Sequence, residues 1–274
     1  MPLSTPAEEL LFLELRRKAK LRLLQMHFES GVGHIGGNLS ALDILLCLYH
    51  YVMTEDDQFV LSKGHAAGAL YISLWSIGRL EEPDLRQFHG EGTRLSGHPP
   101  ATGIPGVLFP TGSLGHGLGL AVGLALGKRL QSAPGRVWCL TSDGEWNEGA
   151  CWESLIFASH HALENLTIVV DANGLQGFGS TKEVADLSPL ADKFRAFGIH
   201  TEEVNGHDFA SLRNALAADH TGTRAVIANT IKGCGVSFME NRMEWHYLPL
   251  SEDQYRQGAR EILESCGTSS VNPL

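Results

Sequence analysis

The amino-acid sequence lacks the features that mark nucleic-acid-binding and membrane-spanning proteins. Only 19% of its 274 residues are charged, the formal net charge is −10, and no basic run is interleaved with aromatic residues. A nucleic-acid partner is therefore not expected, because such proteins carry clustered positive charge. No apolar run approaches the length of a membrane span, and no charged and then apolar leader opens the chain. We expect no membrane partner.

Cysteine is scarce as well. The five cysteines are an odd number without paired spacing, which argues against a disulfide framework and favours a reducing, cytoplasmic setting. Neither a linker rich in proline and serine nor an internal repeat divides the chain. The hydrophobic content is 43%, which over this length is enough for one large core. We interpret residues 1–274 as a single α/β domain.

The most informative stretch predicts two buried, parallel strands. Short apolar runs at Val137–Thr141 and Leu166–Val170 flank an amphipathic segment at about Ala150–Leu163. A strand–helix–strand unit of this length implies that its strands are parallel. The first strand leads to Asp143 and the second leads to Asn173. Because ligands of open parallel sheets lie beyond the carboxyl ends of the strands, both side chains are expected at a ligand site.

These two oxygen-bearing side chains have two possible roles. A carboxylate and an amide oxygen suit a hard divalent cation such as Mg²⁺ or Ca²⁺, which often completes its shell with phosphate. Asp and Asn also cap helices and turns where no ligand is present. The spacing alone leaves both roles open.

Hydrophobic periodicity predicts the other elements. The expected helices are Ala7–Phe28, Ala41–Met53 with Ser40 as its cap, His65–Ile77, Gly115–Leu130, Leu187–Phe197, Asp208–Ala217 and Ser251–Glu264, and the further strands are Phe59–Leu61, Ile199–Val204 and Arg224–Asn229. A glycine-rich loop at Ser30–Asn38 and a long loop at Gly90–Thr111 connect them. A long loop inside a compact domain is commonly a functional one.

Several motifs occur in an order that resembles one enzyme family. They are SGVGHIGGNLSALDILLCLYHYVM, VLSKGHAAGALYISLWSIG, LSGHPPATGIPGVLFPTGSLGHGLGLAVGLALGKRL and TIKGCGVSFMENRMEWH. In this order they resemble the amino-terminal part of transketolase, from about Leu10 to Tyr247. Ser142-Asp143-Gly144 followed by Ala172-Asn173 resembles the thiamine-diphosphate motif, a Gly-Asp-Gly followed about thirty residues later by Asn-Asn.

The resemblance implies a thiamine-diphosphate-binding fold, with a central, mostly parallel sheet and helices on both faces. It implies thiamine diphosphate as cofactor and Mg²⁺, or Ca²⁺, as its metal. The implied metal ligands are Asp143, Asn173 and the backbone carbonyl of Leu175. The implied cofactor contacts are His65, Leu114, Gly115, Asp143, Gly144, Glu145, Asn173 and His246.

Four histidines are implied to be catalytic. By resemblance, His34, His65 and His98 line the substrate channel, and His246 lies near the diphosphate and the donor carbonyl. Taken singly, a histidine of this kind is more often a satisfied core residue or a surface residue.

Two turns carry the remaining implied contacts. A turn at Ser113–Gly117 leads into a helix, and Gly144 and Glu145 follow Asp143 at another helix start. Glycine permits close approach of the backbone, and a helix amino terminus favours anions, so the Gly144 and Glu145 amides could hold the diphosphate. Simple helix packing explains the same glycines equally well.

Four positions depart from the family pattern. Ser142 replaces a glycine, Ala172 replaces an asparagine, His116 replaces a glutamine, and Tyr247 stands where a glycine is usual. His116 and Tyr247 leave the donor and acceptor sugars open and slightly favour a specialised route with an unusual ketose or acceptor. Ser142, Ala172 and Tyr247 are the departures that leave a catalytically silent relative open.

The resemblance implies one component of a two-component transketolase, which moves a two-carbon ketol unit from a ketose or ketose phosphate to an aldehyde. The family's pyrimidine and carboxy-terminal domains have no counterpart in these 274 residues, and the catalytic glutamate belongs to the former. We therefore expect a separate pyrimidine-domain partner in an α2β2 heterotetramer. The alternatives are the alpha subunit of a 2-oxo acid dehydrogenase-like enzyme and a catalytically silent binding or regulatory relative.

Overall fold

The computed structural model describes residues 4–100 and 103–264. Five parallel strands form one sheet in the order β1-β2-β3-β5-β4. They are β1 (Gln58–Leu61), β2 (Val137–Ser142), β3 (Leu166–Ala172), β4 (His200–Asn205) and β5 (Arg224–Asn229). The predicted parallel sheet is confirmed, and the strand bounds differ from the prediction by at most two residues.

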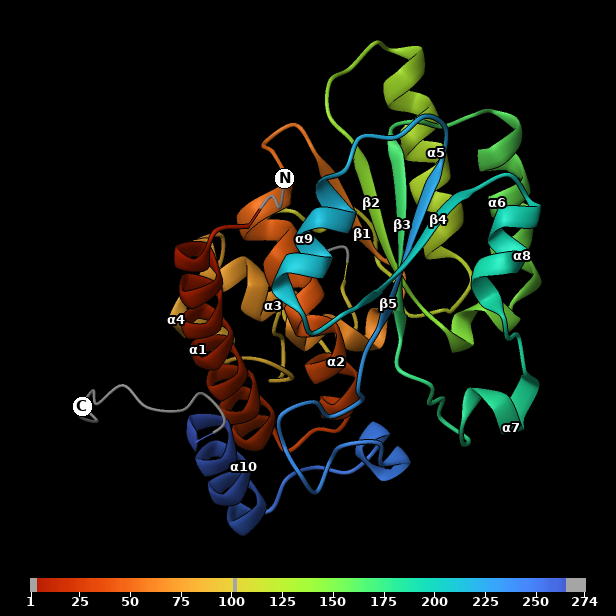
Figure 1. The fold of residues 1–274 in the computed structure, drawn as a ribbon. Coiled ribbons are helices and arrows are strands. Elements are labelled where there is room, and N and C mark those ends of the chain that lie inside the picture. The colour runs from red at the N-terminus through yellow and green to blue at the C-terminus, as the bar shows by residue number, and fades with distance from the viewer. Residues whose placement is uncertain (1–3, 101–102, 265–274) are drawn as a thin grey trace.

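Helices lie on both sides of this sheet (Figure 1). One side carries α1 (Pro6–Ser30), α2 (Ile35–Cys47), α3 (Ala67–Ser76) and α9 (Phe209–Ala217), and the other carries α5 (Gly117–Leu130), α6 (Gly149–His160) and α8 (Leu190–Ala196). The helix α10 (Glu252–Glu264) packs on α1. The short helices are α4 (Glu82–Leu85), α7 (Thr181–Ala185), the π-helical turn η1 (Leu48–Val52) and the 3₁₀ turns η2 (Gly64–Ala66), η3 (Gly144–Asn147) and η4 (Met243–His246).

The strands other than β4 are largely apolar because both faces of the sheet are covered, whereas the edge strand β4 is mostly polar and partly exposed. Side chains of a strand alternate between faces. In β2, Trp138 and Leu140 join the core beside α1, α2, α3 and α9, whereas Val137 and Cys139 join the core beside α5, α6 and α8. Two apolar layers thus hold the sheet between them and fix the direction of its carboxyl edge.

The second helix begins earlier than predicted, at Ile35 rather than Ala41. Ser40 is therefore no cap but a buried residue inside the helix. The glycines that suggested a loop are there for close packing. A Cβ on Gly36 would lie 3.2 Å from Lys232 Cγ, so the helix could not approach this lysine as closely with a larger residue. Tertiary packing here outweighs the poor helix propensity of glycine.

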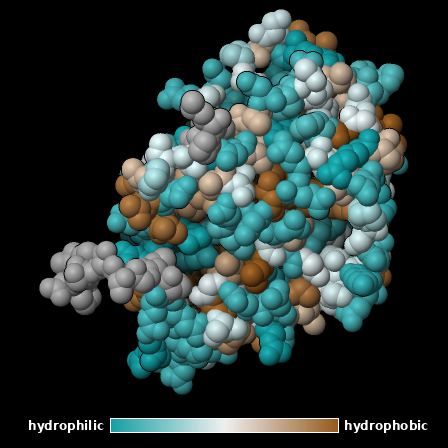
Figure 2. Space-filling view, in the orientation of Figure 1, coloured by the Kyte–Doolittle hydropathy of each residue, from teal (hydrophilic) through white to brown (hydrophobic). Residues whose placement is uncertain are grey.

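The expectation that no run reaches membrane-spanning length was wrong. Among the described residues, the window Ile35–Val52 is long and apolar enough to span a membrane by length and composition alone. Of this window, 78% is buried inside the fold, as in the core helix of a globular protein. The molecular face in Figure 2 is mostly hydrophilic, with apolar side chains in small groups.

Candidate active site

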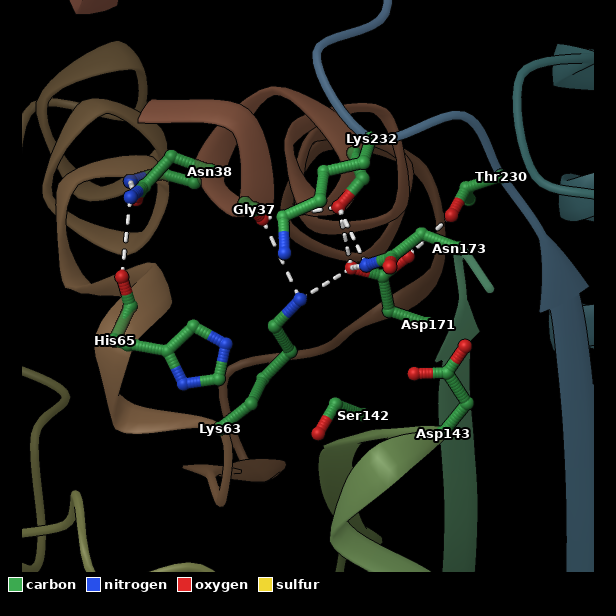
Figure 3. A network of polar contacts seen from close by, with 12 residues as sticks. Gly37, Asn38, Lys63, His65, Ser142, Asp143, Asp171, Asn173, Thr230 and Lys232 are labelled. Carbon is green, nitrogen blue, oxygen red and sulfur yellow. Dashed lines mark hydrogen bonds and ion pairs between the residues drawn. The ribbon is translucent and has the colours of Figure 1, made fainter. Parts of the chain in front are cut away.

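Polar residues converge where the strands end. Lys63 follows β1, Asp143 follows β2, Asn173 follows β3 and Thr230 follows β5. In Figure 3 their side chains face one another across a small space beside α2. Because the strands are parallel, their carboxyl ends meet at one edge of the sheet, the usual ligand position in open α/β sheets. The predicted convergence of Asp143 and Asn173 is thus present in the fold.

Asp143 is a carboxylate without an ion-pair partner among the described residues. Its Oδ1 accepts from the Gly144 amide at 2.7 Å and its Oδ2 from the Gly174 amide at 2.6 Å. Burial and the nearby Asp171 carboxylate raise the pKa of Asp143 to about 6, although the two amides and the Lys63 charge act to lower it. A cation beside this carboxylate would relieve that destabilisation.

Asn173 and Leu175 complete an oxygen-rich corner. Asn173 Oδ1 accepts from the Leu175 amide at 3.1 Å, while its Nδ2 donates to Ser40 Oγ at 3.3 Å. The Leu175 carbonyl lies 3.5 Å from Lys232 Nζ. In the described part of the chain, no group of three or more His, Cys, Asp or Glu side chains is arranged so that it could hold a metal ion. The donors therefore fit a hard cation that shares its shell with a ligand's oxygens, and they do not form a closed metal cage.

A buried ion pair that sequence reasoning missed lies beneath this corner. The Lys63 ammonium contacts Asp171 Oδ2, and both side chains are fully buried. Ser40 donates to the same carboxylate at 2.6 Å, and Thr230 donates to its other oxygen. Burial alone would raise the pKa of Asp171, but Lys63 outweighs it and holds that pKa below its usual range. The only sign of this ion pair in the sequence was a charged residue, Asp171, within the otherwise apolar strand β3.

Lys232 is a second buried lysine that sequence reasoning missed. It is 2% exposed, and its Nζ lies 3.1 Å from His246 Nδ1. Burial and the Lys63 charge lower its pKa to about 8. In Figure 3 the two lysines extend toward the same space. This ammonium has no carboxylate within ion-pair distance among the described residues, so it is available to an anion.

The four predicted histidines lie together around His34. Its ring centroid is 5.9 Å from that of His65, 5.8 Å from His98 and 4.9 Å from His246. They come from the start of α2, from η2, from the long loop and from η4, which are far apart in the sequence. A cavity of about 500 Å³ is lined by three of them (His34, His98 and His246), and also by His89. His89 was not among the predicted residues.

Backbone packing holds His34 in place. Its amide donates to the His246 carbonyl at 3.1 Å, and its φ of 66° is left-handed. A Cβ on the preceding Gly33 would lie 2.4 Å from the Tyr247 carbonyl oxygen. The Gly-His pair is therefore needed for the α2 start to touch the segment that carries His246.

The histidine rings are held neutral near pH 7. Burial lowers the pKa of His34, that of His65 well below its usual range, and that of His246 to about 3. Burial likewise lowers the pKa of His98. Nearby lysines add to this effect at His65 and His246. Each neutral ring can donate from one nitrogen and accept at the other, which suits hydroxyl and carbonyl groups of a sugar.

One buried histidine outside the cluster should make the fold sensitive to acid. His27 is 1% exposed, and burial lowers its pKa to about 4. In the unfolded chain this histidine has an ordinary pKa near 6.5. At a pH between the two values, the unfolded chain therefore binds a proton at His27 whereas the folded chain does not. We expect His27 to remove roughly 3 kcal/mol of unfolding free energy as the pH falls from about 6.5 to about 4.

Urea unfolding at a series of pH values measures this slope. The variant His27→Gln should lose less stability over the same pH range, whereas His160→Gln, at an exposed position, should keep the wild-type slope. Equal slopes in wild type and His27→Gln would contradict the assignment.

The two amides that were predicted to hold the diphosphate, those of Gly144 and Glu145, already donate to acceptors within the chain. The Gly144 amide donates to Asp143, and the Glu145 amide donates to Ser142 Oγ at 3.3 Å. The segment is a 3₁₀ turn of four residues and not the start of a long helix. A diphosphate would have to replace these bonds.

Glu145 has a different visible role from the predicted one. Its carboxylate is fully buried and accepts from the Gly115 amide at 2.9 Å and from the Ser62 hydroxyl. Gly115, at φ 85°, thereby joins the η3 turn. The neighbouring Leu114 is half-buried, and His116 is exposed at the same turn. Glu145 fixes the position of this turn relative to Asp143.

The departures from the family pattern are structurally accommodated. Ser142 bonds the Glu145 amide, and the Ala172 carbonyl accepts from the Thr230 amide at 3.0 Å. Tyr247 is 55% exposed at the rim of the histidine cavity, and its hydroxyl donates to the Gly177 carbonyl at 2.9 Å. Each of these three residues thus has a partner of its own within the fold.

Comparison with known proteins identifies the family. The family model of the transketolase thiamine diphosphate binding domain matches residues 18–263. The chain is 36% identical over 265 residues to an apulose-4-phosphate transketolase subunit of Phocaeicola vulgatus, covering 92% of this chain and 94% of the relative. It is 36% identical over 244 residues to a 6-deoxy-6-sulfo-D-fructose transketolase subunit of a Clostridium species, covering 85% and 89%.

Solved structures agree with the sequence relatives. A transketolase from Leishmania mexicana superposes with a TM-score of 0.87 at 27% identity, and one from Campylobacter jejuni superposes with 0.86 at 27%. They cover 95% and 94% of this chain, which spans 42% and 43% of theirs. These relatives do not favour the 2-oxo acid dehydrogenase alternative. The chain belongs to the transketolase family and corresponds to the amino-terminal, thiamine-diphosphate-binding subunit of a split enzyme.

Proposed function

We propose that this subunit transfers a two-carbon ketol unit from a ketose or ketose phosphate to an aldehyde once it is joined to a pyrimidine-domain chain. The observation that carries the proposal is the pairing of two neighbouring sites. An anion site with an oxygen-rich corner, formed by Lys232, Asp143 and Asn173, lies beside a cavity lined by neutral histidines. The first suits a metal diphosphate and the second suits a polyhydroxylated substrate.

The metal would be Mg²⁺ or Ca²⁺, held by Asp143, Asn173 and the Leu175 carbonyl. The donor set contains only oxygen, and the Asp143 carboxylate lacks an ion pair among the described residues, which fits a hard cation. Asn173 Oδ1 would exchange its bond with the Leu175 amide for the metal. Lys232 would bind the diphosphate as a positive charge.

The other cofactor contacts are proposed from the same corner of the fold. His65 and His246 would bond the cofactor's polar groups, while Leu114 and Gly115 would pack against its apolar part. The amides of Gly144 and Glu145 would turn from their present acceptors to the diphosphate oxygens.

The four histidines of the cavity region would carry out proton transfer to and from the substrate. Thiamine diphosphate, when bound, supplies the carbon nucleophile that attacks a ketose carbonyl and carries the two-carbon unit to the acceptor. His34, His65, His98 and His246 would orient the substrate and hold or move its protons. Because burial keeps the rings neutral, each could accept a proton as a carbon–carbon bond breaks and return it as a new bond forms.

The partner and the substrate follow from the same reasoning. The residues described contain no candidate for the catalytic glutamate of the family, so we propose that a pyrimidine-domain chain supplies it in an α2β2 heterotetramer. Residues 1–274 would act as one domain in the cytoplasm. The relatives are named for apulose 4-phosphate and 6-deoxy-6-sulfo-D-fructose, both anionic ketoses. We propose a specialised anionic ketose of this kind as donor, with Tyr247 and His116 shaping the choice.

Calorimetric titration tests the proposal. Thiamine diphosphate with MgCl₂ is titrated into the chain alone and into the chain mixed with a separately encoded pyrimidine-domain chain. We expect weak binding to the chain alone, tighter binding to the complex, and aldose release from a ketose only in the complex. Binding without turnover of any ketose would favour the catalytically silent alternative, and no binding in either sample would exclude the cofactor.

A further inference from the structure

The segment that carries Lys232 is held in place by residues that do not line the histidine cavity. Lys232 sits in the loop from Thr230 to Gly235 that follows β5. The amide of the preceding residue, Ile231, donates to Nε2 of His207 at 2.9 Å. His207 lies far from Lys232 in sequence, in the connection between β4 and α9. This bond joins the two connections at the carboxyl edge of the sheet.

The orientation of the His207 ring is set by a buried carboxylate. His207 Nδ1 lies 2.8 Å from Oδ2 of Asp43, which belongs to α2 and is fully buried. Because the Ile231 amide donates to Nε2, the ring hydrogen must be on Nδ1 and points at Asp43. Burial lowers the pKa of His207, whereas Asp43 and Cys234 together raise it to about 9, which would place a proton on both ring nitrogens at neutral pH. The Ile231 amide can donate only to an unprotonated Nε2, and this bond favours the neutral ring, so the geometry gives the neutral form in the anchored loop.

A second anchor holds the other end of the same loop. Lys20 of α1 donates to the Cys234 carbonyl at 3.1 Å, and its Nζ lies 3.9 Å from Asp43 Oδ2. Lys20 is 6% exposed, so this contact is shielded from solvent. A Cβ on Gly235 would lie 3.3 Å from Lys20 Nζ, which explains a glycine there. One carboxylate therefore organises both anchors that flank Lys232.

We propose that His207 and Asp43, with Lys20, are positioning residues that hold the loop so that the Lys232 ammonium stays beside Leu175 and His246, where it can bind an anionic cofactor. None of them lines the histidine cavity. The expected effect on cofactor binding rests on the proposed function, whereas the contacts that hold the loop do not depend on it. Loss of the Ile231 bond should let the loop move and expose Lys232.

Two amide variants separate the bonds. In His207→Gln the longer side chain can place its amide oxygen where Nε2 accepts from Ile231, while the donor to Asp43 is lost. In His207→Asn the shorter side chain can reach Asp43 but not Ile231. His160→Asn, at an exposed helix end, is the matched control. Lys20→Met, which removes only the second anchor and keeps the length of the stem, is the second variant should His207→Asn not fold.

The first measurement requires no cofactor. Amine labelling with acetic anhydride at a single pH, read by mass spectrometry, gives the rate at which Lys232 reacts relative to the exposed lysines of the same sample and so reports its exposure. We expect this relative rate to rise in His207→Asn and Lys20→Met, because Lys232 is only 2% exposed while the loop is held, and to stay at the wild-type value in His207→Gln and His160→Asn. A Lys232 labelling rate that does not change in folded His207→Asn or Lys20→Met would overturn the proposal.

The second measurement is the affinity of the assembled two-chain complex for thiamine diphosphate with Mg²⁺. We expect at least a tenfold loss in His207→Asn and less than a twofold change in His207→Gln. Faster labelling of Lys232 in His207→Asn, with no cofactor binding even to the wild-type complex, would support the positioning role and overturn the proposed function instead. Equal affinity in wild type and His207→Asn would refute the link to the cofactor.

Discussion

Replacement of Asp143 by alanine is expected to abolish metal-dependent binding of thiamine diphosphate. Asp143 is the one carboxylate at the carboxyl edge of the sheet that lies beside Asn173 without an ion pair among the described residues. Without it, a divalent cation would retain only an amide oxygen and a carbonyl from this chain. We expect affinity to fall at least a hundredfold, which is about 2.8 kcal/mol of binding free energy. Calorimetry with the assembled complex measures it.

The pH dependence of cofactor affinity gives an independent check of the proposed metal site. Burial and Asp171 raise the pKa of Asp143 to about 6, and a metal requires the ionised carboxylate. Wild-type affinity should therefore be highest above pH 6 and weaken as the pH falls below it. Asp192→Ala, which removes an exposed carboxylate that pairs with Arg195, should leave the affinity unchanged. Metal-dependent binding by Asp143→Ala at wild-type strength would refute the proposed metal site.

Replacement of Asp171 by alanine is expected to be the most destabilising change considered. Asp171 is fully buried and is the carboxylate that pairs with the fully buried Lys63 ammonium. Its removal leaves that charge without a carboxylate and the Thr230 hydroxyl without its acceptor, while Ser40 and Lys63 keep only the Gly37 carbonyl. Removal of one member of a buried pair typically costs about 3–5 kcal/mol, because the other charge stays buried. Urea unfolding at pH 7.5 measures the loss.

A double variant separates the charge from the packing. In Lys63→Met/Asp171→Asn, neither charge of this pair is left buried. The asparagine oxygen can still accept from Thr230, and its amide nitrogen can donate to Ser40, whose hydroxyl keeps the Gly37 carbonyl as acceptor. We expect this variant to recover most of the stability lost in Asp171→Ala. Glu252→Ala, which breaks an exposed pair with Arg256 on α10, should change stability by less than about 1 kcal/mol. A similar loss in the double variant would mean that packing, and not the unpaired charge, causes the effect.

The sequence determined the sheet because its strands are local patterns. Each apolar run is long enough to bury both faces, and the intervening amphipathic segments require parallel connections. The positions of Asp143 and Asn173 followed directly, since a residue just after a parallel strand lies at its carboxyl edge. The amino-terminal boundary of α2 did not follow, because its glycines suggest a loop. Only the close approach of Lys232 and Trp245 to Gly36 shows why glycine is needed there.

Only the tertiary structure decided which polar residues act together. His34, His65, His98 and His246 come from four separate segments, and no spacing rule brings them within ring-contact distance. Lys63, Asp171 and Lys232 look in the sequence like ordinary charges near strand ends. Their importance comes from burial, because a buried charge cannot interact with water and the loss of any remaining contact therefore costs more free energy. Burial depends on how distant segments pack, so the fold alone gives the anion site, the neutral histidines and the His207 anchor behind them.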